Sequence, residues 1–150
     1  MKRLTLILTA LLLLGIGESF AWATFGHEIV IEVAKRHISE RTKQNIAKYI
    51  SYDITKDAVW MDAHRDDKEI AYTTAWHVYN VDERYEYDMN PRLRKGDAIL
   101  AMKVSDHNLL RYEQLTDSAV VMNIRMVIHF AGDIHCPTHS YVPGPRCFWP

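Results

Sequence analysis

Three histidines and one aspartate fall within eleven residues near the C-terminal end of this chain. They are His129, Asp133, His135 and His139, in the run HFAGDIHCPTH. On a helix, His129 and Asp133 project from one face one turn apart, and Pro137 ends the helix so that His139 returns from a loop. Neutral imidazole and carboxylate together are the ligand set that suits zinc. The alternative is a surface histidine, a capping histidine and a solvated aspartate.

The helix that carries this motif is strongly apolar. Its apolar residues are Ile124, Val127, Ile128 and Ala131. A carboxylate on such a helix needs a partner, because burial of an unpaired charge is costly. The surroundings of Asp133 therefore favour a metal site over a solvated surface. At i+6 from His129, His135 points away from that ligand's face, and we expect it to support a ligating carboxylate instead.

Helical segments must position this motif, because apolar residues recur at helical spacing through most of the chain. We expect helices over 26–37, about 39–51, about 55–65, about 97–111, and from 116 or 118 to about 135. Ser39 is expected to cap the second helix, with Ile38 packing as a staple just before it. The sequence therefore predicts an all-α fold.

Two segments do not follow the helical pattern. Residues 71–81 are β-branched and aromatic, which is typical of a strand. No second convincing strand exists to pair with them, so we expect an extended segment lying across the helices. Residues 82–95 are charged and contain Asn90-Pro91, which predicts a surface loop.

The first 21 residues have the pattern of a secretory signal peptide. Lys2 and Arg3 precede an apolar run over 4–16, and Ser19 and Ala21 supply small residues where a signal peptidase cuts. We expect cleavage after Ala21, export to the periplasm or the extracellular medium, and no stable membrane anchor afterwards. The mature domain is then 22–150. The alternative is an uncleaved anchor, although the run is short for a membrane span.

Composition sets few limits on function. The chain has 150 residues, about one domain, and a net charge of −1, so no strong overall field selects nucleic acid or membrane. Attraction for phosphate must then come from a local site. Cys136 and Cys147 could close a small disulfide loop beside His139, remain free, or pair beyond residue 150. The oligomeric state is left open.

Three further residues are potential metal ligands. His27 follows Gly26, Asp62 lies two residues after Trp60, and His77 follows Trp76. Singly, each has a plain structural reading as a helix-start residue, a solvated carboxylate or a hydrogen-bonded core histidine. Together with His129, Asp133 and His139, one shared metal site is the economical explanation.

These residues carry a resemblance to a known family. The motifs are Trp22-Ala-Thr-Phe-Gly-His27, Trp60-Met-Asp62, Trp76-His77 and His129-x3-Asp133-x5-His139. In this order they resemble the zinc-dependent single-strand nucleases of the S-one/P-one type, which are related to bacterial zinc-dependent phospholipase C. The resemblance extends from Trp22 to His139 and implies an all-α, zinc nuclease or phospholipase C-like helical domain.

The resemblance also implies three zinc ions. The first would be bound by Asp62, His77, His129 and Asp133. A second would be bound by His27 and by the α-amine and carbonyl of Trp22, with Asp133 bridging the two ions; signal cleavage would expose that amine. The third would take His139 and two residues that the family supplies further along. Those positions would lie beyond Pro150, so we expect a C-terminally truncated domain with two near-complete sites.

The implied activity is metal-dependent hydrolysis of phosphodiesters. Single-stranded DNA or RNA would be cut endonucleolytically to 5′-phosphate products, with possible 3′-nucleotidase activity. The resemblance assigns catalytic roles to Asp62, Asp133 and Arg65. Arg65 lies where the family has a basic residue near the scissile phosphate, and its alternative role is a surface ion pair with Asp66 or Asp67. Four tyrosines could stack an unpaired base, although core packing is the commoner role: Tyr72, Tyr79, Tyr85 and Tyr87.

Two other functions remain open. One is phospholipase C activity on the same scaffold. The other is a truncated zinc-binding helical domain without turnover, because one imidazole holds the third zinc poorly. For this chain we expect weak or absent hydrolysis.

Overall fold

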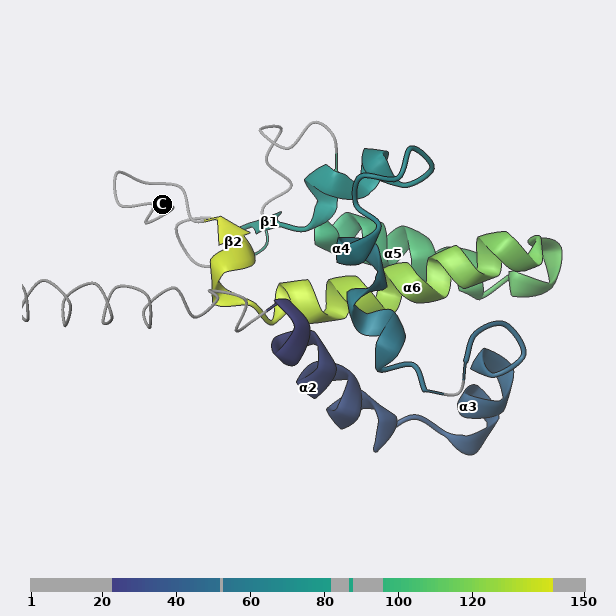
Figure 1. The fold of residues 1–150 in the computed structure, drawn as a ribbon. Helices are drawn as coiled ribbons and strands as arrows, with labels where there is room; N and C mark the ends of the chain where they lie inside the picture. The colour runs from purple at the N-terminus through teal and green to yellow at the C-terminus, as the bar shows by residue number, and fades with distance from the viewer. Residues whose placement is uncertain (1–22, 52, 82–86, 88–95, 142–150) are drawn as a thin grey trace, which may run out of the picture.

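The computed structural model describes residues 23–51, 53–81, 87 and 96–141, and this part of the chain is predominantly helical (Figure 1). The α-helices are α2 (Ala23–Lys35), α3 (Glu40–Ile46), α4 (Trp60–Ala63), α5 (Ala98–Leu109) and α6 (Asp117–Ile134). The short 3-10 helices are η1 (Lys56–Val59), η2 (Ala71–Trp76), η4 (Tyr112–Gln114) and η5 (Pro137–His139). The prediction of an all-α fold is confirmed. Within the described ranges, no helix is long and apolar enough to cross a membrane.

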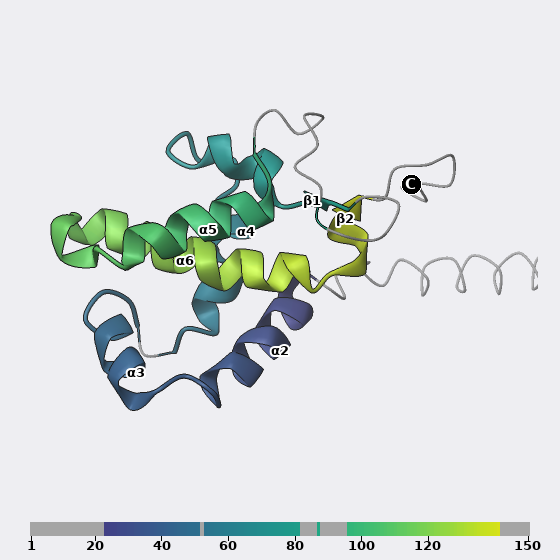
Figure 2. The same cartoon turned by 180° about the vertical axis from the view of Figure 1, so that it is seen from behind.

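Helix α6 is the centre of the fold. Figures 1 and 2 show α5 running beside it and α2 packed against it from another direction. It buries residues on more than one side: Val120, Ile124, Met126, Ile128, His129, Phe130, Gly132 and Asp133. A helix with apolar residues on several faces must be covered from several directions, and α2, η1, α4 and α5 all contact it.

Two apolar clusters share α6. The first contains Ile31, Ile50, Ile54, Ala58, Val120, Ile124 and Ile128. The second contains Met61, Ala98, Ala101, Met126 and Phe130. Because η1 contributes Ala58 to the first cluster and α4 contributes Met61 to the second, this short stretch packs into both apolar clusters beside α6. The position of the predicted ligand Asp62 is thereby tied to the core.

Side-chain caps begin three of the helices. Ser39 Oγ accepts from the amide of Thr42, as predicted, and Asp97 Oδ1 accepts from the amide of Leu100. Thr116 Oγ1 accepts from the amide of Ala119. These caps satisfy amides that have no partner within the helix, which explains why the helices begin where they do.

The second and third predicted helices are shorter than expected. Helix α3 ends at Ile46 instead of Ser51, and the following residues form tighter turns, such as the bond from the amide of Tyr49 to the carbonyl of Ile46. The predicted helix over 55–65 divides into η1 and α4. At this division the carbonyl of Ala58 accepts a hydrogen bond from His129. A tertiary contact therefore lies at the division between η1 and α4, whereas α3 passes into local turns.

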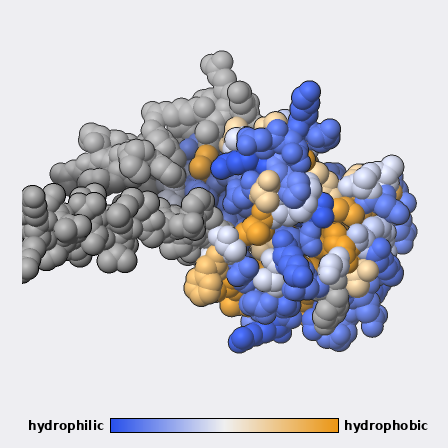
Figure 3. Space-filling view, in the orientation of Figure 1, coloured by the Kyte–Doolittle hydropathy of each residue, from blue (hydrophilic) through white to orange (hydrophobic). Residues whose placement is uncertain are grey.

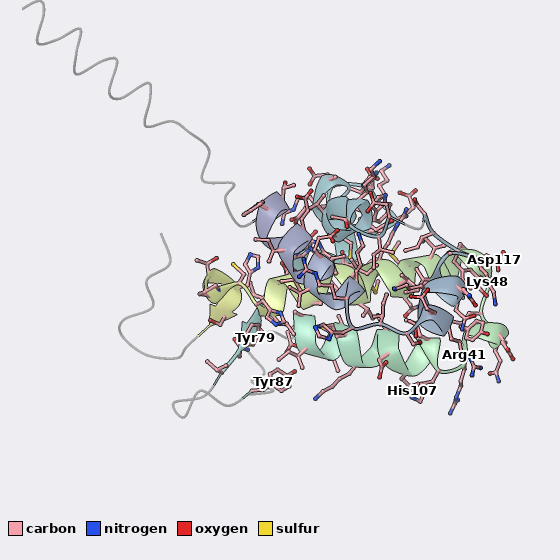
Figure 4. All side chains as sticks on the ribbon, turned by 90° about the horizontal axis from the view of Figure 1, so that it is seen from below. Arg41, Lys48, Tyr79, Tyr87, His107 and Asp117 are labelled. Atoms are coloured by element: carbon pink, nitrogen blue, oxygen red, sulfur yellow. The ribbon has the colours of Figure 1, made fainter. Side chains whose placement is uncertain are left out.

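The expectation of an extended segment over 71–81 is wrong for its first half. Residues 71–76 form η2, and only β1 (Tyr79–Asn80) is a strand, paired in parallel with β2 (Ser140–Tyr141). A two-residue strand is too short to leave an alternating pattern, so the sequence did not reveal the partner. The hydroxyl of Tyr79 donates to the carbonyl of Ile134, which places β1 beside the end of α6 (Figure 4). The predicted loop over 82–95 lies outside the described residues except for Tyr87.

Helix α2 has apolar residues on two sides. Ile31 is buried in the first cluster, whereas Phe25, Ile29 and Val33 are exposed at four-residue spacing. Apolar surface is visible over this part of the molecule in Figure 3. Helix α2 therefore carries more apolar surface than the described residues cover.

Phe130 provides a test of the second cluster. It is fully buried and its ring packs edge-on against His77. We expect Phe130→Ala to lower the free energy of unfolding by about 3–5 kcal/mol, because it removes a large buried ring and leaves a cavity. Urea denaturation measures this change. The matched control is Leu110→Ala at an exposed position, expected within about 0.5 kcal/mol of the wild type; equal losses in both variants would contradict the packing described.

Candidate metal centre

The carboxylate of Asp133 lies among four imidazoles. Its Oδ1 atom is 3.1 Å from His27 Nε2 and 3.0 Å from His139 Nδ1. Its Oδ2 atom is 3.2 Å from His77 Nδ1 and 3.4 Å from His129 Nε2. The histidines come from α2, the end of η2, α6 itself and η5 just after it, so segments near and far in sequence meet at one carboxylate.

His129 is held in a defined tautomer. Its Nδ1 lies 2.7 Å from the carbonyl oxygen of Ala58, and because a carbonyl can only accept, Nδ1 carries the hydrogen. In the neutral ring, Nε2 therefore presents a lone pair. That atom points into the cluster, 3.0 Å from His77 Nδ1. A backbone acceptor on the outer nitrogen is the usual means of orienting a metal-binding histidine.

His77 and Asp62 complete this side of the cluster. His77 is buried, and its Nδ1 is 3.6 Å from Asp62 Oδ1, while His129 Nε2 is 3.8 Å from the same oxygen. These distances exceed a hydrogen bond, so Asp62 is near both imidazoles without being bonded to either. The Asp62 side chain is 30% exposed and that of His139 is 28% exposed. The cluster therefore reaches solvent at these two residues.

His27 is packed tightly by α6. Its ring stacks on that of His129, with centroids 4.5 Å apart and planes inclined by 17°. A Cβ atom at Gly132 would lie only 2.3 Å from His27 Cδ2. Glycine at 132 is therefore required for the ring of His27 to reach Asp133. Sequence reasoning missed this role, although the glycine directly precedes a predicted ligand.

The protonation states of His129 and Asp133, both fully buried, suit metal binding. Burial, opposed by the charge of Asp133, lowers the pKa of His129 to about 4, so its ring is neutral near pH 7. Burial alone would raise the pKa of Asp133, but the nearby rings of His139, His27 and His77 outweigh burial and hold that pKa below its usual range. A neutral imidazole and an ionised carboxylate are the forms that bind a divalent cation.

The donor atoms fit a metal ion such as zinc. Two groups each place their ligand atoms within 4.8 Å of one another: His27, Asp62 and His129, and His77, His129 and Asp133. Buried His77 Nε2 has no hydrogen-bond partner among the described residues, and buried Asp133 Oδ2 makes no hydrogen bond there despite lying 3.2 Å from His77 Nδ1. Buried polar atoms in a native fold are rarely left so, and a cation with imidazole and carboxylate ligands would account for the Asp133 oxygen.

A family model described as S1/P1 Nuclease matches residues 22–143. The chain belongs to this family. It is also similar to Endonuclease 2 of Arabidopsis thaliana, at 24% identity over 148 residues. That match covers 89% of this chain and 50% of the relative, so the chain spans half the length of the curated relative it matches. No solved structure matches the chain.

The S1/P1 motifs recognised in the sequence are brought together by the fold. Six of the seven predicted ligands lie in the cluster: His27, Asp62, His77, His129, Asp133 and His139. The seventh, Trp22, lies outside the described residues, as does the segment expected to be a signal peptide. For all seven residues, the role of ligand to a particular zinc ion remains a prediction.

The other residues singled out in the sequence of this S1/P1 family member lie outside the histidine–aspartate cluster. Arg65 is exposed in the turn after α4, and among the described residues no ion pair joins it to Asp66 or Asp67. His135 does not support a carboxylate as expected: it is exposed and its Nδ1 donates to the carbonyl of Ala131.

Cys136 is buried with its Sγ 2.9 Å from Thr138 Oγ1. Cys147 lies outside the described residues, so the disulfide remains a prediction.

Asp133 is the residue on which we expect metal affinity to depend most, because four imidazoles approach its two oxygens. We expect the protein to bind zinc in a calorimetric titration, and Asp133→Asn to weaken that affinity by roughly 100-fold or more, since substitutions in the surrounding shell alone cost 10- to 100-fold. At one zinc concentration, the thermal midpoint of the wild type should rise more than that of this variant. His107→Ala, at an exposed position on α5, is the control and should bind as the wild type does (Figure 4). Unchanged affinity in Asp133→Asn would reject the centre.

Gly132 gives a test that needs no metal. We expect Gly132→Ala to destabilise the protein by about 1–3 kcal/mol, because the added methyl overlaps the ring of His27. In a His27→Ala background the overlap disappears, and the same change should stabilise by about 0.5–1 kcal/mol through helix propensity. Denaturant unfolding measures both. A destabilisation of equal size in the two backgrounds would show that the clash with His27 is not its cause.

Proposed function

We propose that this chain carries the metal-binding part of a zinc-dependent nuclease that hydrolyses the phosphodiester bonds of single-stranded DNA or RNA. The products would carry 5′-phosphates, and a 3′-nucleotidase activity would accompany the cleavage. The observation that carries the proposal is the convergence of four imidazoles on buried Asp133, with Asp62 beside two of them. Membership of the S1/P1 nuclease family supports the choice of substrate class.

Asp133 lies between the residues that would hold the zinc ions, so the other ligands would divide around it. One ion would be held by Asp62, His77, His129 and Asp133. Another would be held by His27, Asp133 and the free amine of Trp22, which requires that export remove residues 1–21. His139 would serve a third ion together with donors from elsewhere. Zinc bound in this way supplies positive charge that polarises a phosphodiester and lowers the pKa of water.

The protein's own groups prepare the centre and admit the substrate. Asp133 remains ionised because imidazoles surround it, and His129 remains neutral because it is buried and bonded to Ala58. Asp62 and His139 are the partly exposed members, so a phosphate is expected to approach from their side. The guanidinium of Arg65, exposed three residues after Asp62, would attract the phosphate and offset charge developing on its oxygens.

A preference for single strands follows from access to the centre. Bases held in a duplex cannot splay out to lie against protein side chains, whereas unpaired bases can stack on aromatic rings. Among the described tyrosines, Tyr72 is exposed and meets Trp76 edge-on, so its ring is available for stacking. The hydroxyls of Tyr79 and Tyr87 bond within the fold, to the carbonyl of Ile134 and to Asp97, which favours structural roles for both.

Cleavage assays on matched substrates test the proposal. With zinc added, we expect slow cleavage of denatured DNA or single-stranded RNA, slower cleavage of duplex DNA, and 5′-phosphate ends on the products. Turnover should be weak because, among the described residues, His139 is a single donor for the third ion. Asp133→Asn is the control for contaminating nuclease and should abolish the cleavage.

Phosphatidylcholine is the substrate that separates the nuclease from a phospholipase. Hydrolysis of the lipid without cleavage of nucleic acid would overturn the proposal in favour of phospholipase C activity. Zinc binding with no hydrolysis of any substrate would identify a binding domain without turnover. Cleavage as fast as that by a full-length relative would contradict the expectation of an incomplete third site.

A further inference from the structure

Arg125 connects α6 to the short segments that carry Asp62. It lies one turn before His129 on α6. Its Nε donates to Oδ1 of buried Asp57 in η1 at 2.8 Å, and its guanidinium carbon lies 3.9 Å from the ring centroid of Trp60, the first residue of α4. One side chain therefore makes an ion pair with η1 and a cation–π contact with α4.

The contacts of Trp60 extend across α4. Its ring stacks on that of His64, with centroids 4.2 Å apart and planes inclined by 18°. His64 Nδ1 lies 2.8 Å from the carbonyl oxygen of Trp60 and donates to it. Asp62 lies between these two residues in the sequence. Both ends of the turn that carries Asp62 are thus linked to the guanidinium of Arg125.

This turn needs such support because of its length. Helix α4 spans Trp60–Ala63, and a single helical turn is not stable without tertiary contacts. Asp62 makes no hydrogen bond to His77 or His129, and its contacts with them, at 3.6 and 3.8 Å, are too long to fix its side chain by themselves. The position of Asp62 must then come from its backbone, which η1, Trp60 and His64 hold in place.

Arg125 suits this role better than a lysine would. Its planar guanidinium can pair with Asp57 and lie over the indole ring at once, whereas an ammonium is a point charge that serves one of these contacts well. Its partner is Asp57 and neither of the predicted metal-binding carboxylates. Arg125 therefore acts on the centre through the backbone of η1 and α4.

We propose that Arg125 is a positioning residue for the metal centre: by clamping Asp57 and Trp60 to α6, it sets the distance between Asp62 and His129. This inference rests on the proposed zinc binding. Arg125 and His129 stand on one rigid helix, and η1 is joined to that helix a second time by the bond from His129 to Ala58. The two links fix the orientation of α4 where one would leave it free to rotate.

A double-mutant cycle in zinc affinity tests the proposal on the full chain. We expect Arg125→Met, which keeps the aliphatic stem, to lower zinc affinity by about 10- to 100-fold. In an Asp62→Asn background the same substitution should cost less than about 2-fold, because the ligand that Arg125 positions has already been lost. Arg41→Met removes an exposed arginine on α3 and should leave affinity unchanged (Figure 4).

The visible absorption spectrum of the Co²⁺-loaded protein supplies a readout that a general loss of stability would not reproduce. Arg125→Met should shift this spectrum toward that of Asp62→Asn. Circular dichroism verifies folding, and if Arg125→Met does not fold, Arg125→Lys keeps a charge beside Asp57 and should show a smaller loss with the same dependence on Asp62. A full loss of affinity in both backgrounds would overturn the inference, as would an unchanged affinity in Arg125→Met. A wild type that binds no zinc would reject the proposed function as well.

Discussion

The burial of the Asp133 carboxylate is the constraint around which this structure is organised. A buried anion is costly unless positive or hydrogen-bonding groups surround it, and here histidines from four segments approach its two oxygens. In the absence of a cation these rings stabilise the carboxylate, and with a cation the same atoms become ligands. The arrangement thus links the stability of this part of the fold to the chemistry proposed for it.

The scaffold achieves this with one long helix and several short pieces. Helix α6 supplies His129 and Asp133 one turn apart and is rigid because it is packed on several sides. His27 stands on the 13-residue helix α2, whereas the remaining members stand on or beside short segments with little intrinsic stability, above all the four-residue helix α4. Contacts to α6 hold these segments: the bond to Ala58, the clamp of Arg125, and the close approach that Gly132 permits. These contacts therefore determine how accurately the ligand atoms are placed relative to one another.

Two features of the described part of the molecule bear on its relation to the longer relative. Helix α2 exposes an apolar row while its opposite side is buried, and Asp62 and His139 are the members of the cluster that reach solvent. The relative has as much length again outside the matched region. On the proposed function, affinity for zinc would depend mostly on the buried residues, whereas turnover would depend also on the partly exposed side at Asp62 and His139. This difference is why binding and hydrolysis are expected to separate in this chain.

The sequence alone determined the class of fold, the family and the candidate ligands. Helical periodicity identified α6, and a serine placed just before an apolar run identified the cap at Ser39. The order of the histidine and aspartate motifs was enough to identify the family, because ligand chemistry restricts those positions to few residue types. Local patterns could not predict that 71–76 is helical or that 55–65 divides in two, since distant contacts override weak local preference there. The tautomer of His129, the clamp of Arg125 and the requirement for glycine at 132 were decided by tertiary structure alone. Each depends on which groups far apart in the chain come within a few ångströms, and that information is not present in any local stretch of sequence.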